Sequence, residues 1–255
     1  MLLHSKVFGD GHPLLILHGF LGTGDNWKSL GLKFSKIGLQ IHLIDQRNHG
    51  RSFHSNIFNY NDMAKDLKYY CNYHDIKKCT ILGHSMGGKT AMFTAANYPE
   101  IIEKIIIADI SPGFYPVHHL NILNGLLSLD FNIIKSRKEA DKKLSEIIFD
   151  QSIRQFLLKN LCWNSAGNLS LRPNLKILKE NIGEIGKELP CQYIIETPAL
   201  FLKAELSDYI NDYHRAKIFN QFTNSSIETI SNAGHWLHVE NSHDFFLSVK
   251  NFLAS

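Results

Sequence analysis

The chain has 255 residues, of which 44% are hydrophobic and 20% are charged, so it is long enough to bury the core of one large α/β domain. Its formal net charge of +3 and its lack of a dense Lys/Arg patch argue against a nucleic-acid-binding protein, although a mildly basic surface suits an anionic substrate such as an acyl-CoA. Four scattered cysteines, no signal-peptide pattern and no apolar run of roughly 20 residues predict a cytoplasmic protein without stable membrane insertion.

Short apolar runs alternate with longer amphipathic stretches up to residue 110, which is typical of strands alternating with helices. Residues 2–8 predict an antiparallel edge strand that leads into the sheet. Helices are expected over residues 26–37, 62–73 and 86–98, the last of them ending before a proline. The largely apolar runs predict parallel strands that are buried on both faces: Pro13–Leu17, Gln40–Ile44, Cys79–Leu82 and Lys104–Ala108.

The loop after the strand Pro13–Leu17 reads HGFLG from His18 to Gly22. In α/β enzymes with a nucleophilic serine, this loop supplies one backbone N–H to the oxyanion hole, and the residue after the nucleophile supplies the other. With the nucleophile proposed below, the donors are the amides of Phe20 and Met86. Such preorganised donors stabilise the developing negative charge by about 3–4 kcal/mol.

A polar segment, DQRNHGRS from Asp45 to Ser52, follows the strand Gln40–Ile44. Asp45 and His49 suggest a metal site at first sight. Buried polar groups in such a loop are usually engaged in hydrogen bonds, which leaves no open coordination position. We therefore expect Asp45, Arg47 and His49 to tie the loop to the edge of the sheet and to hold no metal ion.

The sequence GHSMG from Gly83 to Gly87 matches the G-x-S-x-G pattern, which is weak evidence by itself. Its context is informative, because it follows an apolar strand and opens a helix, where a nucleophile elbow must lie. The sharp turn strains the serine backbone, so the residues two before and two after it must be small, as both glycines are. We predict that Ser85 is the nucleophile and that the helix N-terminus points N–H groups at the same spot.

The pattern changes after Asp109. Between residues 111 and 189 we find no convincing strand, but helical periodicity recurs over residues 120–129, 138–149, 153–161 and 175–185. A helical block that interrupts an α/β pattern is best interpreted as a cap inserted over the sheet. We predict a core domain from residues 1–110 and 191–255 and a helical cap from residues 111–190. Its aromatic residues offer surface for an acyl chain, and we expect two or three to line the pocket: Phe114, Tyr115, Phe131, Phe149, Phe156 and Trp163.

Strand and helix patterns return over residues 199–202, 213–222, 226–230 and 244–253. His235 lies in the loop between the last predicted strand and the last helix, which emerges at the same sheet edge as the elbow. A serine hydroxyl needs a neighbouring proton acceptor, and imidazole is matched to neutral pH. We predict that His235 is the base. His238 is expected to start the helix or pack beneath the site, and the side chain of His84 to leave the elbow in another direction.

The group that orients the imidazole has two candidates. Asp109 ends the strand Lys104–Ala108, and Asp208 follows the strand of residues 199–202, where most enzymes of this architecture carry the acid. We favour Asp109, for a reason that depends on a family resemblance.

The motifs together resemble the YbfF-type bacterial esterases of the α/β-hydrolase superfamily, which are also similar to a group of mitochondrial α/β-hydrolases. The resemblance covers nearly the whole chain apart from the cap, and it implies a cap-covered carboxylesterase or acyl-thioesterase without a cofactor. Members tend to carry Ser at the usual position of the acid, which Ser207 occupies here; the loop departs from relatives that have Gly-Gly near Ala204. The motifs that carry the resemblance are HGFLG (18–22), DQRNHGRS (45–52), GHSMGGK (83–89), DISP (109–112) and GHW (234–236).

Three functions fit these residues. The first is hydrolysis of carboxylic esters or acyl thioesters through an acyl-enzyme on Ser85. The second is a lyase of the menaquinone-pathway type, which has the same fold and triad and needs arginines for substrate carboxylates; the cap offers Arg137, Arg154 and Arg172. The third is a small-molecule binding protein, which need not keep a complete triad. The intact triad residues and the resemblance favour the hydrolase.

Overall fold

The centre of the structure is a seven-stranded sheet with the strand order β1-β3-β2-β4-β5-β8-β9. The structure is a computed structural model that describes residues 1–254. The edge strand β1 is antiparallel to β3, and the other neighbouring strands are parallel. The strands are β1 Ser5–Phe8, β2 His12–Leu17, β3 Leu39–Ile44, β4 Cys79–His84, β5 Ile102–Ala108, β8 Ala199–Ala204 and β9 Ser225–Ile230.

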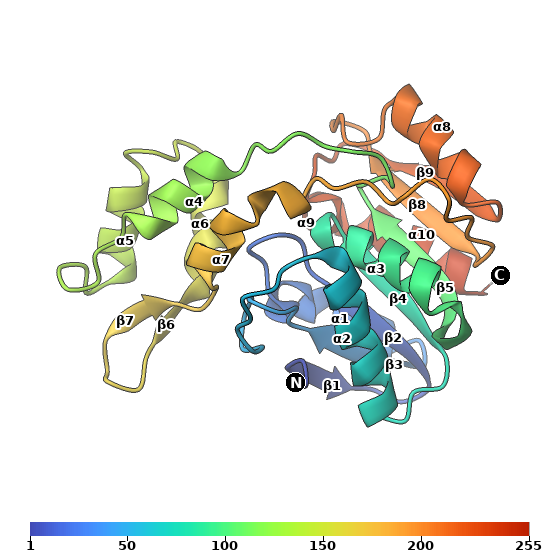
Figure 1. Ribbon diagram of the computed structural model, residues 1–255, viewed down its shortest axis with the longest axis horizontal. Helices are drawn as coiled ribbons and strands as arrows, with labels where there is room; N and C mark the ends of the chain where they lie inside the picture. The colour runs from blue at the N-terminus through green and yellow to red at the C-terminus, as the bar shows by residue number, and fades with distance from the viewer. Residues whose placement is uncertain (255) are drawn as a thin grey trace.

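Helices cover both faces of this sheet (Figure 1). Successive side chains of a strand point to opposite faces, so Leu15 and Leu17 of β2 belong to one buried cluster and Leu14 and Ile16 to another. The first cluster packs under the helices α2 (Tyr60–Tyr73), α3 (Met86–Asn97) and α8 (Asp212–Gln221). The second packs under the helices α1 (Lys28–Ser35), α9 (Leu237–Glu240) and α10 (Ser242–Ala254). The apolar runs of the sequence are therefore strands with two buried faces, as predicted.

Residues 120–184 add nothing to the large sheet and lie beyond one edge of it (Figure 1). They form the helices α4 (Leu120–Leu127), α5 (Arg137–Leu144), α6 (Gln151–Leu157) and α7 (Leu175–Glu180). The chain leaves the sheet after β5 and returns to it at β8, as a cap insertion requires. We propose that residues 111–190 are a cap.

One prediction for this segment is wrong, because it also contains a hairpin. The strands β6 (Leu161–Trp163) and β7 (Leu169–Leu171) pair antiparallel in a sheet of their own. Each strand has three residues, which is too short to give the alternating pattern that identifies a strand in a sequence. Short 3₁₀ helices at Gly24–Trp27, Pro99–Ile101, Leu158–Asn160 and Ile182–Glu184 complete the elements.

The described residues contain no helix that is long and apolar enough to span a membrane.

Candidate active site

The carboxyl ends of the central strands bring the predicted site residues to one edge of the sheet. Ser85 directly follows β4, and its N–H donates to the carbonyl of Ala108 at the end of β5 at 3.0 Å. Asp109 directly follows β5, and its N–H donates to the carbonyl of Leu202 in β8 at 2.9 Å. Ligands of parallel sheets gather at this edge.

Ser85 occupies a strained turn between β4 and α3. Its backbone has φ 51° and ψ −116°, a left-handed φ that side chains other than glycine rarely adopt. A Cβ atom added to Gly83 would lie 2.2 Å from the carbonyl oxygen of Gly87, and one added to Gly87 would lie 2.4 Å from that of Leu17. The elbow therefore needs both glycines, as the sequence predicted, and it presents Ser85 at the N-terminus of α3.

The structure joins His235 to Asp109. His235 Nδ1 lies 2.8 Å from Asp109 Oδ2, and because a carboxylate accepts, Nδ1 carries the hydrogen and Nε2 is free to take a proton. Asp109 is fully buried with φ 48°, and its Oδ1 accepts the N–H of Ala204 at 3.0 Å. Asp208 is exposed and makes no hydrogen bond to His235 in the described chain. Of the two acids, the structure brings Asp109 to the imidazole.

Ser207 and Tyr209 also contact this pair, and neither contact was predicted. The hydroxyl of Ser207, which the family resemblance places at the usual position of the acid, donates to Asp109 Oδ2 at 2.5 Å. The ring of Tyr209 stacks on His235, with centroids 4.1 Å apart and planes at 17°. The motif resemblance had pointed to Ser207, whereas no local pattern marks Tyr209.

The predicted oxyanion loop is fixed by a buried histidine. Gln46 N–H donates to His18 Nε2 at 3.0 Å, so His18 Nδ1 carries the hydrogen and donates to the carbonyl of Gly19 at 2.8 Å. Burial lowers the pKa of His18 to about 4, which keeps the ring neutral. No hydrogen bond within residues 1–254 uses the backbone N–H of Phe20 or of Met86, so both amides are available to a ligand.

The three side chains expected to tie the loop from Asp45 to Ser52 to the sheet do form hydrogen bonds, but to Gly24, to α2 and within the loop, not to the edge strands of the described sheet. Asp45 accepts the N–H of Gly24 at 2.7 Å and that of Arg51 at 2.8 Å. Arg47 binds both carboxylate oxygens of Asp66, and His49 Nδ1 donates to the carbonyl of Arg47 at 2.9 Å. No group of three or more His, Cys, Asp or Glu side chains is arranged to hold a metal ion in the part of the chain that the structure describes.

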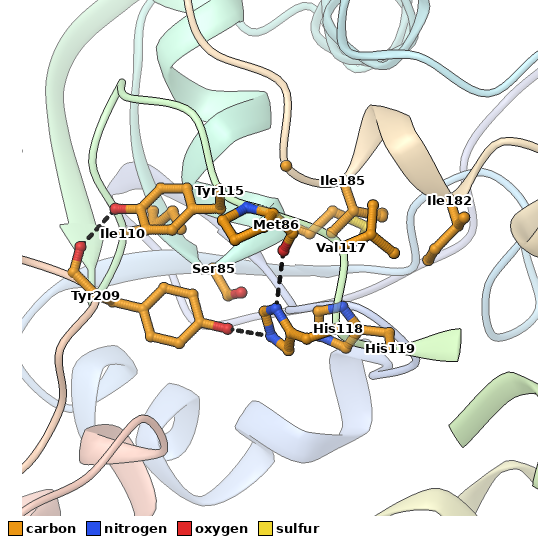
Figure 2. A pocket seen from close by; sticks show the side chains of 12 residues that line it. Ser85, Met86, Ile110, Tyr115, Val117, His118, His119, Ile182, Ile185 and Tyr209 are labelled. Carbon is orange, nitrogen blue, oxygen red and sulfur yellow. Dashed lines mark hydrogen bonds between the residues drawn. The ribbon is translucent and has the colours of Figure 1, made fainter. Parts of the chain in front are cut away.

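A mostly apolar pocket opens at Ser85 (Figure 2). The segment that leads into the cap forms one wall with Tyr115, Val117 and His118, and the segment that leads out forms another with Ile182 and Ile185. Tyr115 donates to the carbonyl of Tyr209 at 2.5 Å, and Tyr209 Oη lies 2.7 Å from His118 Nε2, so the entry segment is bound to the loop after β8 (Figure 2).

Two expectations about the cap need correction. Of the six aromatic residues named above, all within the described chain, Tyr115 alone lines the pocket at Ser85, and Phe149 and Trp163 are 86% and 66% exposed. The arginines needed by a lyase line neither of the described pockets. Arg154 pairs with Asp141 at 2.8 Å, and Arg137 donates to backbone carbonyls.

Comparisons with known proteins show the family of the chain. Residues 12–132 match the family model described as the alpha/beta hydrolase fold. The chain is 35% identical to mouse sn-1-specific diacylglycerol lipase ABHD11 over 262 residues, which covers 99% of this chain and 85% of the relative. It is 29% identical to Esterase YbfF of Escherichia coli over 247 residues, covering 96% of this chain and 94% of that protein.

Solved structures of two hydrolases have the same fold as this chain. A marine microorganism esterase superposes with a TM-score of 0.95 at 39% identity, covering 98% of this chain and 99% of that chain. The E-2-(acetamidomethylene)succinate hydrolase superposes with a TM-score of 0.83 at 19% identity, covering 99% and 95% of the two chains. The second likeness concerns the fold alone.

Proposed function

The chain belongs to the α/β-hydrolase family, among its YbfF-type esterases, and we propose that it is a serine hydrolase that cleaves carboxylic esters. The observation that carries the proposal is the hydrogen bond between His235 and the buried Asp109, at the sheet edge where Ser85 opens into a pocket. A binding protein would need neither a strained serine nor an imidazole oriented by a buried carboxylate.

The mechanism follows from the free nitrogen of His235. As Ser85 Oγ bonds to the acyl carbon, its proton passes to Nε2, and the imidazolium that forms is stabilised by Asp109. The negative charge on the former carbonyl oxygen is stabilised by the N–H groups of Phe20 and Met86. The imidazolium then gives its proton to the leaving oxygen, which departs as an alcohol. Water attacks the acyl-enzyme in the same way and releases the carboxylic acid.

The pocket supports an ester with an apolar acyl group. Its lining beyond Ser85 is mainly hydrocarbon, including Met86, Ile110, Val117, Ile182 and Ile185. Two relatives point the same way, since one is named a diacylglycerol lipase and another a putative esterase/lipase. An acyl thioester, such as an acyl-CoA, presents the same carbonyl to Ser85, and we include it as a second substrate type. We place the enzyme in the cytoplasm on the sequence evidence.

The proposal is tested by the hydrolysis of p-nitrophenyl esters of increasing acyl length and of acyl-CoAs. We expect turnover of at least one ester series by the wild-type chain and none above background by Ser85→Ala. Equal hydrolysis by both proteins would refute a serine mechanism. Turnover of acyl-CoAs alone would replace the ester assignment with a thioesterase.

A further inference from the structure

His84, the residue before the proposed nucleophile, points away from the pocket and lies at the base of the site. It is the last residue of β4, and 4% of it is exposed. Because Ser85 adopts a left-handed conformation, the two neighbouring side chains diverge at the elbow. The imidazole of His84 packs between the rings of His235 and His238, each with a centroid 4.7 Å away.

A hydrogen bond connects His84 to the loop of the proposed base. His84 Nε2 lies 2.8 Å from the backbone carbonyl oxygen of His235, 151 positions along the chain. A carbonyl only accepts, so Nε2 carries the hydrogen and Nδ1 holds the lone pair. Asp109 holds the His235 ring from its Nδ1 side, and His84 holds the backbone from which that ring projects.

The same ring supports the oxyanion loop. A Cβ atom added to Gly19 would lie 2.8 Å from His84 Nδ1, so the backbone beside Phe20 rests directly on the imidazole. His84 is joined to Ser85 by a peptide bond. His84 is therefore linked through its backbone to the nucleophile turn, and its side chain contacts the oxyanion loop after β2 and the base loop after β9.

The surroundings of His84 keep its imidazole uncharged. Burial, with further contributions from His235 and His238, lowers the pKa of His84 well below its usual value. Burial also lowers the pKa of His238 to about 3 and that of His18 to about 4. The surrounding imidazoles of His18, His84 and His238 are therefore uncharged at neutral pH, so none of them repels the positive charge that forms on His235 during the reaction.

We propose that His84 is a positioning residue, whose Nε2–H fixes the backbone of His235 while its ring supports Gly19 and the oxyanion amides. The inference rests on the proposed function, because it assigns a role within that mechanism. A displacement of about 1 Å in a reacting group lowers turnover by about 10²-fold, so the loss of this support acts on kcat.

The test compares His84→Phe, which keeps a ring and loses the donor, with His84→Gln, which keeps an N–H donor. With a p-nitrophenyl ester, we expect kcat of His84→Phe to fall by about 10- to 100-fold with KM changed by less than about threefold. We expect His84→Gln to recover most of the loss. An unchanged kcat in His84→Phe, or equal losses in both variants, would overturn the proposal.

Two controls keep the result interpretable. The free energy of unfolding in urea is measured for each variant, and His84→Leu replaces His84→Phe if the larger ring prevents folding. Ser85→Ala is assayed in parallel with wild type. If Ser85→Ala retains activity, the serine mechanism itself is wrong; if Ser85→Ala is inactive and His84→Phe retains full kcat, the positioning role alone fails.

Discussion

At the scale of single residues, Asp109 fixes the orientation of the His235 imidazole through a hydrogen bond to Nδ1. It sits in a left-handed conformation after β5, and its carboxylate accepts hydrogen bonds from Ala204, Ser207 and His235. Three donors on a fully buried carboxylate hold its position and stabilise its charge. In the proposed mechanism the acid thus comes from the end of β5 and not from the loop after β8, where Ser207 donates a hydrogen bond to it.

Replacing Asp109 with Asn tests this assignment against the other candidate acid, Asp208. Asp109→Asn keeps the shape but leaves His235 without the acceptor for Nδ1–H, so we expect kcat to fall by about 10³- to 10⁴-fold. Asp208→Asn is the matched control, since Asp208 is exposed, and its kcat should stay within about twofold of wild type. The opposite ranking in steady-state assays would move the acid to Asp208.

The sequence predicted much of this site, because its residues lie in motifs with a mechanical cause. Gly83 and Gly87 are required by the turn around Ser85, and His235 lies in a loop whose place the strand order determines. The contact of Tyr209 with His235 was not predictable, because it depends on how two loops pack. The role of Ser207 depends on a hydrogen bond between residues 98 positions apart.

At the scale of elements, the two segments that join the cap to the sheet cross at Tyr115 and Gly186. The N–H of Tyr115 donates to the carbonyl of Gly186 at 2.8 Å, and a Cβ atom on Gly186 would lie 1.8 Å from the carbonyl oxygen of Tyr115. Lys89, on the helix after the elbow, is fully buried and donates to the carbonyl of Gly113 at 2.5 Å. These contacts position the pocket walls next to Ser85.

Gly186→Ala is expected to force the two segments apart. Overpacking of this kind costs about 1–3 kcal/mol, so the free energy of unfolding in urea should fall by that amount, and KM for the ester should rise because Tyr115 and Gly186 both line the pocket. Gly183→Ala is the control, because its Cβ would meet no atom within 4 Å. Equal stability of the two variants would contradict this account of the crossing.

The strands of the large sheet could be predicted from the sequence more accurately than the elements of residues 111–190. Strands β2 to β5 are buried on both faces, so their apolar runs are strong signals, and the structure extends them by only one or two residues at some ends. In residues 111–190 large apolar side chains such as Phe149 and Trp163 are exposed, and the strands β6 and β7 have three residues each. Periodicity therefore predicted neither the hairpin nor which aromatic residues line the pocket.

At the scale of the whole molecule, the fold buries several histidines whose pKa is lowered by burial. Burial lowers the pKa of His18 and His42 to about 4, and that of His49 and His238 to about 3. The unfolded chain takes up protons near pH 6.5, and the folded chain does not until a lower pH. The free energy of unfolding is therefore not reduced by these histidines above about pH 6.5, and it falls as the pH decreases below that value.

We expect the free energy of unfolding to fall between pH 7.5 and pH 5.5, by up to about 1.4 kcal/mol per pH unit for each such histidine below pH 6.5. Urea denaturation at a series of pH values measures it. His238→Phe keeps the ring that stacks on Trp27, 4.0 Å between centroids, and should make the dependence less steep. His243→Gln, at an exposed site, is the control. A stability that does not change over this range would contradict the account.

The central claim is that Ser85 is acylated with His235 as its base, and trapping of the covalent intermediate tests it most directly. The protein is mixed with a fluorophosphonate, or with a p-nitrophenyl ester whose acyl-enzyme hydrolyses slowly. It is then digested, and the peptides are analysed by mass spectrometry. We predict one adduct, on the peptide that contains Ser85, with none in Ser85→Ala and a rate at least about 10³-fold lower in His235→Ala. Ester turnover without an adduct on that peptide, together with full activity of Ser85→Ala, would contradict the claim.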